Sequence, residues 1–203
     1  MSVKISTQNS KLGVIPSVNI TPIVTCRPNC PCAKDCYAMK GRFRFASVKD
    51  SMTTNYETYI HSPEIYFKEI KSFIDDGIRV YSYFRWHAAG DIVDKPYLEG
   101  MVKLARELHN TSFLAFTKKH ELINRYIGEG GVIPDNLHIV FSAWGNELVP
   151  FNPYGFPVAY VRFSDDAKNS SIPQEAIECS GDCTTCLQCW RINHGESVVF
   201  NKH

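Results

Sequence analysis

The stretch SFLAFTKKHELINRYIGEGGVIPDNLHIVFSA, residues 112–143, contains the pattern that decides the fold. It opens with a short apolar strand at 112–116 and continues into a helix around 119–127. A loop with three glycines and a proline then leads to a second strand at 137–143. Two strands joined through a helix are typical of a βαβ unit, in which the strands run parallel. The stretch therefore predicts a parallel sheet covered by helices.

The same alternation continues on both sides of this unit. We expect, in chain order, a strand at 18–24, helices at 47–60 and 63–76, a strand at 78–84, a helix at 95–109 and a strand at 157–163. Pro22 places the first strand at a sheet edge or a bulge. The order predicts a single α/β domain over 1–203. The sheet is expected to be either a partial or small (β/α) barrel-like parallel sheet or an open doubly wound sheet. A cysteine-rich C-terminal extension is expected at 175–203.

Composition and charge exclude several classes of protein. The 203 residues include 22 basic and 21 acidic side chains, which gives a net charge of +1 and argues against duplex DNA as a partner. No apolar run is long enough to span a bilayer, and the polar N-terminus lacks the apolar core of a secretory signal. We therefore expect a cytoplasmic protein without membrane contact, in a compartment that disfavours disulfides.

All eight cysteines fall in two eleven-residue windows, one at 26–36 and one at 179–189. Thiolates are soft ligands, and short loops let several of them reach one metal centre, so the clustering predicts metal binding. We favour one or two [4Fe–4S] clusters, with structural zinc as the alternative metal and disulfides as a weaker alternative. The expected ligands are Cys26, Cys30, Cys32, Cys36, Cys179, Cys183, Cys186 and Cys189.

The spacing makes the two windows unequal. The second window has gaps of three, two and two residues, which suits a closed four-thiolate site. In the first window the single-residue gap between Cys30 and Cys32 would point their side chains to opposite sides of an extended chain. We therefore expect Cys26, Cys32 and Cys36 to leave one iron of a cluster open, with Cys30 a spare thiol or a ligand elsewhere. One site with ligands from both windows is a further alternative.

Polar residues follow the ends of the predicted strands, where a parallel α/β fold gathers its chemistry. Three are candidate catalytic residues: His87 as an acid, base or ligand, Asp91, and Lys118 as a binder of carboxylate or phosphate. The alternative for His87 is a packed histidine, and the alternative for Asp91 is a turn aspartate that orders the next helix. The alternative for Lys118 is a solvated lysine.

The candidate cofactor-binding residues lie at the same strand ends. Gly90 would allow close backbone approach, and Asp91 would bind an amine or ribose hydroxyl of a ligand. Ser142 and Arg162 are weaker candidates of the same kind.

The chain also resembles a known family. The resemblance runs through NSKLG (9–13), TCRPNCPCAKDCYAMK (25–40), FRWHAAGDI (84–92), FLAFTKK (113–119) and CTTCLQCW (183–190). These motifs are similar to those of the gene product eighty-eight-like proteins of phages and prophages. The resemblance implies a phage or prophage origin and action in the cytoplasm of a bacterial host, and it supplies no reaction.

A more distant likeness of layout is to radical S-adenosylmethionine (SAM) enzymes. Those enzymes have a cysteine motif after the first strand of a partial barrel and a Gly-Gly-Glu element after the second. Here the first cysteine window and Gly90-Asp91 stand in these places, although the cysteine spacing differs and an aspartate replaces the glutamate.

Two functions follow as expectations. The first is an iron–sulfur protein. Its more specific form is a radical SAM-like enzyme with an unknown substrate, in which SAM binds the open iron and contacts Gly90 and Asp91. The second is a zinc-stabilised phage protein that binds a host macromolecule without catalysis.

Overall fold

The strands form one sheet whose order largely follows the sequence. The computed structural model describes residues 2–202, and its eight strands are β1 (Ile5–Ser6), β2 (Ser17–Val18), β3 (Tyr83–Trp86), β4 (Ser112–Thr117), β5 (Leu137–Ser142), β6 (Val158–Arg162), β7 (Ile177–Glu178) and β8 (Ser197–Asn201). Their order across the sheet is β1-β2-β3-β4-β5-β6-β8-β7. Only the β1–β2 pair is antiparallel among these strands. The predicted parallel α/β sheet is confirmed.

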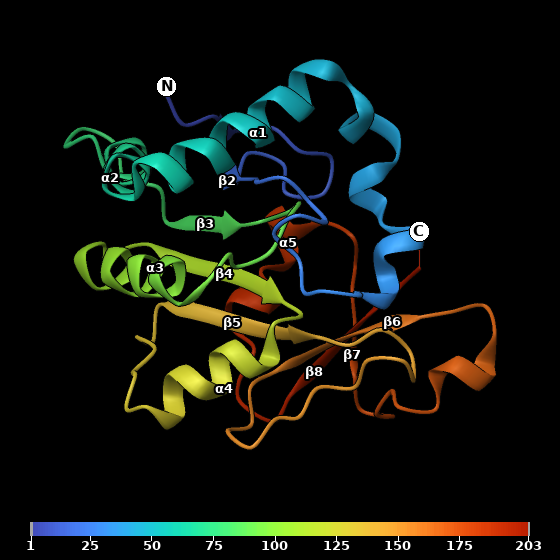
Figure 1. Cartoon of the computed structure of the whole chain (residues 1–203). Coiled ribbons are helices and arrows are strands. Elements are labelled where there is room, and N and C mark those ends of the chain that lie inside the picture. Colours follow the sequence, from blue (N-terminus) through green and yellow to red (C-terminus); the bar gives the residue numbers. More distant parts are fainter. Residues whose placement is uncertain (1, 203) are drawn as a thin grey trace.

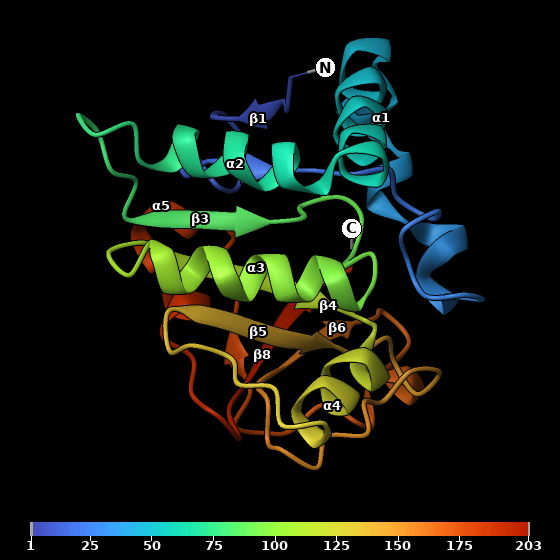
Figure 2. The ribbon, with the colours of Figure 1, turned by 60° about the vertical axis from the view of Figure 1, so that its left-hand side comes forward.

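Five α-helices accompany the sheet: α1 (Ala46–His61), α2 (Pro63–Ile74), α3 (Lys95–Glu107), α4 (His120–Gly128) and α5 (Cys183–Cys186). Figures 1 and 2 show α2, α3 and α4 on one side of the sheet and α5 on the other. From β2 to β6, each new parallel strand is added to the same side of the preceding one. The fold is thus wound in one direction with its long helices on one face, as in a partial barrel.

The larger core lies between the sheet and the long helices, on what we call the helical face. Phe84, Trp86 and Phe113 from the strands pack here against buried side chains of α2, α3 and α4. Helix α3 begins where Asp94 accepts a 2.8 Å hydrogen bond from the Tyr97 amide, which confirms the predicted cap.

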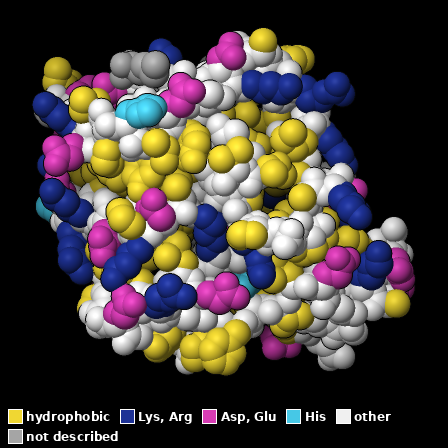
Figure 3. Space-filling view, viewed as in Figure 1, with side chains coloured by type: hydrophobic (Ala, Val, Ile, Leu, Met, Phe, Trp, Pro, Cys, Tyr) yellow, Lys and Arg dark blue, Asp and Glu magenta, His cyan; other side chains and the backbone are white. Residues whose placement is uncertain are grey.

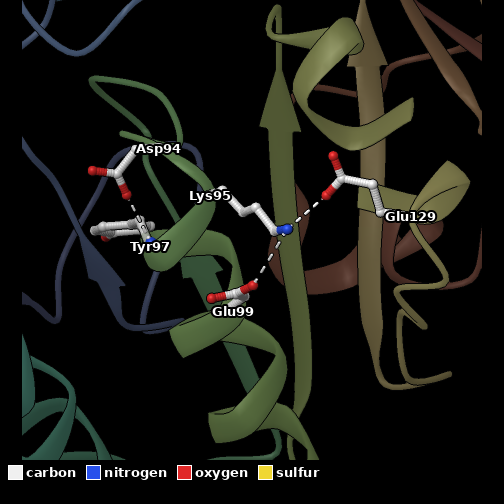
Figure 4. Close-up of polar contacts among 5 residues, drawn as sticks. All are labelled: Asp94, Lys95, Tyr97, Glu99 and Glu129. Carbon is white, nitrogen blue, oxygen red and sulfur yellow. Dashed lines mark hydrogen bonds and ion pairs between the residues drawn. The ribbon is translucent and has the colours of Figure 1, made fainter. Parts of the chain in front are cut away.

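Ion pairs hold α3 to its surroundings at the surface. The Lys95 ammonium lies 2.6 Å from Glu129 at the end of α4 and 3.9 Å from Glu99 on its own helix (Figure 4). All three side chains are about half exposed, so solvent screens these pairs and they add little to stability. Burial of the apolar face of α3 is therefore the main source of its stability.

The smaller core covers the opposite side of the sheet, which we call the cysteine face. Leu12 and Ile15 from the N-terminal segment and Trp190 and Ile192 from the C-terminal segment pack here on the strands. The strand residues beneath them are Leu114, Val140, Ala159 and Val198. The C-terminal cysteine-rich segment predicted at 175–203 is present, and it also supplies β8, which lies between β6 and β7.

Two predicted strands have different bounds in the structure. The strand expected at 18–24 is only the two-residue β2, because the following backbone turns away to bond the loop after β3. The strand expected at 78–84 begins at Tyr83, because Asp76 accepts hydrogen bonds from two following amides and closes a turn. Ile78 at this turn is 97% exposed, so its apolar side chain was a misleading signal. Strands β1, β7 and β8 were not predicted.

The surface carries charges of both signs. Figure 3 shows lysine and arginine side chains interspersed with acidic ones over one face of the molecule. This distribution agrees with the near-neutral net charge. Within residues 2–202, no helix is long and apolar enough to cross a membrane.

Gly100 on α3 tests the packing between α2 and α3. A Cβ atom at this position would lie 2.3 Å from the Phe67 ring on α2. Gly100→Ala should therefore destabilise the protein by about 1–3 kcal/mol through overpacking, even though alanine favours a helix by about 1 kcal/mol. Urea unfolding would measure the change, with the exposed Lys103→Ala on the same helix as a control within about 0.5 kcal/mol of wild type. A stabilised Gly100→Ala protein would show that the two helices are not in close contact.

Candidate metal and ligand site at the carboxyl ends of the strands

The first cysteine loop, residues 26–36, lies beyond the carboxyl ends of the strands. In Figure 1 this blue segment stands past the arrowheads of β3, β4 and β5. The chain here forms short 3-10 helices, including Pro31–Asp35 and Tyr37–Met39. Asp35 pairs with Lys202, just after β8, at 2.7 Å, and the Tyr37 hydroxyl donates to the Ala88 carbonyl after β3. The loop therefore spans the sheet from β2 to β8.

Gly90 allows the loop after β2 to meet the loop after β3. Its φ of +91° is in the left-handed region that favours glycine. A Cβ atom there would lie 2.7 Å from the Ile20 carbonyl oxygen and 3.0 Å from the Thr25 hydroxyl. The predicted close backbone approach is thus present, but the approaching backbone is the protein's own.

Asp91 connects the ends of three strands. Its buried carboxylate accepts hydrogen bonds from the Thr117 hydroxyl at 2.6 Å, the Lys118 amide at 2.9 Å and the Ile92 amide at 2.8 Å. Its own amide donates to Thr25 at the start of the first cysteine loop, at 3.2 Å. Burial raises the pKa of Asp91, and these donors oppose the shift. The contacts support the structural alternative for this residue more directly than ligand binding.

Cys30 and Cys32 lie side by side, contrary to the expected opposite orientation. Their sulfur atoms are 3.2 Å apart. The expectation assumed an extended chain, whereas Pro31 begins a 3-10 turn that places the two side chains on one side. The hydrogen bond between the two thiols lowers the pKa of Cys30, and the charge of Lys118 adds to this effect. Cys30 is therefore equipped to act as a ligand.

The second cysteine set, Cys179 to Cys189, lies against the cysteine face. Cys183 opens α5, and its amide donates to the Lys11 carbonyl at 2.9 Å. Burial raises the pKa of Cys189 to about 12, which Arg85 partly opposes. Burial also raises the pKa of Cys183, against the charges of Lys11 and Arg85. These thiols need a metal or a cation to become thiolates.

All eight cysteines are free thiols. Within the described residues 2–202, no group of three or more histidine, cysteine or acidic side chains is arranged as a ready metal cage. The donor chemistry still fits a thiophilic metal, because each set offers four thiols on a short, turn-rich segment. Metal sites commonly take their final geometry only on binding, so each set would have to close around its metal.

The histidine candidate is buried on the helical face. The His87 Nε2 atom lies 2.8 Å from the Tyr97 hydroxyl, which in turn lies 2.6 Å from the Tyr66 hydroxyl. The Nδ1 atom has no partner among residues 2–202, and the backbone has a φ of +51°. Burial, with smaller effects of Arg85 and Lys119, lowers the pKa of His87 to about 3. The ring is therefore neutral and packed, and a catalytic role stays a prediction.

The remaining candidates lie at different places. Lys118 follows β4 directly, near Asp91 and the first cysteine loop. Ser142 ends β5, and its carbonyl lies 3.0 Å from the His120 ring. Arg162 ends β6 and pairs with Glu178 on β7 at 2.6 Å. The structure therefore places Lys118 near the first cysteine loop, whereas Arg162 pairs with an acidic side chain at the sheet edge.

Several residues that position this region were missed from the sequence. Buried Asn55 on α1 donates to the Lys4 and Asn19 carbonyls and accepts from the Lys4 amide, which joins β1 to the segment after β2. Arg85 projects from β3 over the Phe116 ring, 4.2 Å from its centroid. Arg85 directly follows the strand predicted at 78–84 and lies inside the observed β3, so an arginine at a strand end was the available signal for a functional residue.

These features define a class: an α/β protein wound in one direction, with one cysteine loop across the strand ends and a second cysteine set on the face opposite the long helices. A family model described as Gene product 88 matches residues 3–192. The chain belongs to the Gene product 88 family, which confirms the resemblance to phage and prophage proteins. Comparisons with curated proteins and with solved structures gave no match.

Alanine substitutions at two glycines of similar φ, Gly90 and Gly77, should differ in how much stability they remove. Gly90→Ala and Gly77→Ala both place a methyl group on a left-handed residue, with φ of +91° and +82°. Nothing lies within 4 Å of a Cβ atom at Gly77, so its variant should lose about 1–2 kcal/mol from backbone strain alone. Gly90→Ala should lose at least about 2 kcal/mol more, because the methyl group also meets the Ile20 carbonyl. Equal losses in chemical unfolding would contradict the close contact.

The neutral state of His87 predicts a pH dependence of stability. Because its folded pKa of about 3 lies below the unfolded value near 6.5, the unfolded chain binds more protons below pH 6.5. Stability should then fall on acidification by about 1.4 kcal/mol per pH unit from this group. His87→Asn, which tolerates the left-handed backbone, should lose about 2 kcal/mol less than wild type between pH 6.5 and 5.

Urea unfolding at several pH values would measure this difference. The exposed His109→Asn should follow the wild-type curve. Parallel curves for His87→Asn and wild type would show that His87 is protonated equally in both states.

Proposed function

We propose that this protein is an iron–sulfur protein, and more specifically a radical SAM-like enzyme acting in the cytoplasm of a bacterial host. The observation that carries the proposal is the position of the first cysteine loop, across the carboxyl ends of parallel strands wound in one direction. In such folds the strand ends are where substrates and cofactors bind.

The first cysteine loop supports a [4Fe–4S] cluster. Cys26, Cys32 and Cys36 would hold three irons, and Cys30 is close enough to Cys32 to serve as an alternative ligand. When bound, a cluster with an open iron would supply an electron to a SAM molecule on that iron. Lys118 places a positive charge near Cys30 and Cys32, which compensates thiolate charge.

The chain's own residues would hold the geometry of this site. Asp91 fixes the loops after β3 and β4 relative to Thr25, just before Cys26. Gly90 leaves no side chain between those loops. We therefore assign Asp91 a positioning role at the first cysteine loop. These hydrogen bonds give less support to direct contact between Asp91 and SAM.

A zinc-stabilised binding protein is the second candidate. The observation that favours it is the second cysteine set, whose neighbours Trp190 and Ile192 are part of the core on the cysteine face. A closed four-thiolate zinc site there would stabilise the fold without catalysis. The same chain can hold zinc in this set and a cluster in the first.

Metal analysis of protein purified without oxygen separates these proposals. We expect a brown protein with about four iron and four sulfide ions in the first cysteine loop, and iron or zinc in the second set. Cys26→Ser should lose the iron of the first loop while the metal of the second set is kept. Cys186→Ser should have the opposite effect, so each variant is the control for the other. A colourless protein with two zinc ions and no sulfide would contradict the iron–sulfur proposal.

The enzymatic part has its own measurement. Loaded, reduced protein should release deoxyadenosine from SAM, and Cys26→Ser should lose this release. An intact cluster without any SAM cleavage would leave an iron–sulfur protein that is not a radical SAM enzyme.

A further inference from the structure

Two half-buried cations near the cysteine loops, Arg85 and Lys118, make no ion pair with an acidic side chain in the described part of the chain. Within residues 2–202, the ion pairs of the structure use Lys40, Lys71, Lys95, Arg162 and Lys202. Neither Arg85 nor Lys118 belongs to an ion pair in this part of the chain. Both residues are half-buried. Unpaired cations away from bulk water favour an anion that is not part of the protein.

Arg85 is held in a fixed place on the cysteine face. Its neighbour in register on β4 is Leu114, which lies in the core of that face. Its Nε atom donates to the Trp86 carbonyl at 3.0 Å, and its guanidinium covers the Phe116 ring at 4.2 Å. Because Phe116 lies two residues beyond Leu114, the guanidinium leans toward the carboxyl end of the sheet. One nitrogen is bonded to the protein and the others remain for a ligand.

Lys118 lies next along the same direction. It follows Phe116 by two residues, a rise of about 7 Å in an extended chain. Its amide is fixed by the Asp91 carboxylate, while its ammonium makes no hydrogen bond within residues 2–202. The Tyr37 hydroxyl donates to the Ala88 carbonyl, three residues after Arg85, and so holds the chain that follows the first cysteine loop beside this end of the sheet. Arg85 and Lys118 thus flank one region between the sheet and the first cysteine loop.

The residues around Arg85 and Lys118 suit an oxyanion group on an organic molecule. A guanidinium binds carboxylate or phosphate through two parallel hydrogen bonds, and an ammonium adds a point charge. Burial lowers the pKa of Arg85, although Tyr37 and the thiols of Cys189 and Cys183 oppose this shift. The rings of Phe116 and Phe200 lie edge to face, 5.8 Å apart, beside the guanidinium, so they offer an apolar wall.

We propose that Arg85 and Lys118 bind the carboxylate or phosphate group of a small-molecule substrate between the first cysteine loop and the cysteine face. This inference rests on the proposed function, because it names the substrate class of the same site. The competing role for the two cations is to compensate thiolate charge only.

Titration of the full-length, metal-loaded protein with inorganic phosphate and with succinate tests the proposal. Calorimetry should give saturable binding of at least one probe, and the stronger probe identifies phosphate or carboxylate as the group. Arg85→Gln and Lys118→Gln should each weaken binding at least 10-fold, and Arg85→Lys should fall between wild type and Arg85→Gln. Lys103→Gln, an exposed cation on α3, should bind as wild type does.

Metal content and thermal unfolding of the same samples complete the test. No saturable binding, or binding unchanged in both glutamine variants, would overturn the proposal. Loss of metal in Arg85→Gln and Lys118→Gln without anion binding by wild type would assign the two cations to the thiolates. If Arg85→Gln does not fold, Lys118→Gln alone decides. Anion binding by a protein loaded with zinc would preserve this site while contradicting the iron–sulfur function.

Discussion

The buried carboxylate of Asp91 is the interaction on which the rest of this region depends. Its two oxygens join the loop after β3 to the end of β4, and its amide joins the same loop to Thr25, just before the first cysteine. Removing a carboxylate from water is costly unless hydrogen bonds replace those lost, and here three donors do so. Adjacent Gly90 makes this arrangement possible, because any side chain would meet Ile20. The strand ends, and the cysteine loop attached to them, are therefore fixed relative to one another.

The two cysteine sets occupy different environments, and this difference bears on their chemistry. The first lies in a loop that is tied down at both sides by Asp35 and Tyr37 but has few buried apolar side chains of its own. The second is continuous with the core of the cysteine face through Trp190. A loop tied at its edges can change its internal geometry when a metal binds, whereas a segment anchored in a core changes less. The first set is therefore freer than the second to rearrange around a ligand.

Much of the fold follows from sequence patterns. The strand predicted at 112–116, which is β4 in the structure, the α3 helix with its Asp94 cap, and the parallel order all follow from periodicity and turn residues. The short strands were not readable, because two residues such as Ser17 and Val18 carry no period and are held by their neighbours. The turn at Asp76 was hidden by apolar residues on an exposed loop. At the site, the clustering of the cysteines in the sequence marked them as candidate ligands. The side-by-side placement of Cys30 and Cys32, however, depends on a local turn that the spacing does not specify.

The place of β8 in the sheet has a consequence for synthesis. This strand, residues 197–201, lies between β6 and β7, and it is the last part of the sheet to leave the ribosome. Until then β6 lacks its outer neighbour, and the segment that carries the second cysteine set has no completed surface to pack on. The nascent chain thus exposes the first set of thiols well before the second. Under the proposed function, the first set of thiols is therefore available to a metal earlier in synthesis than the second.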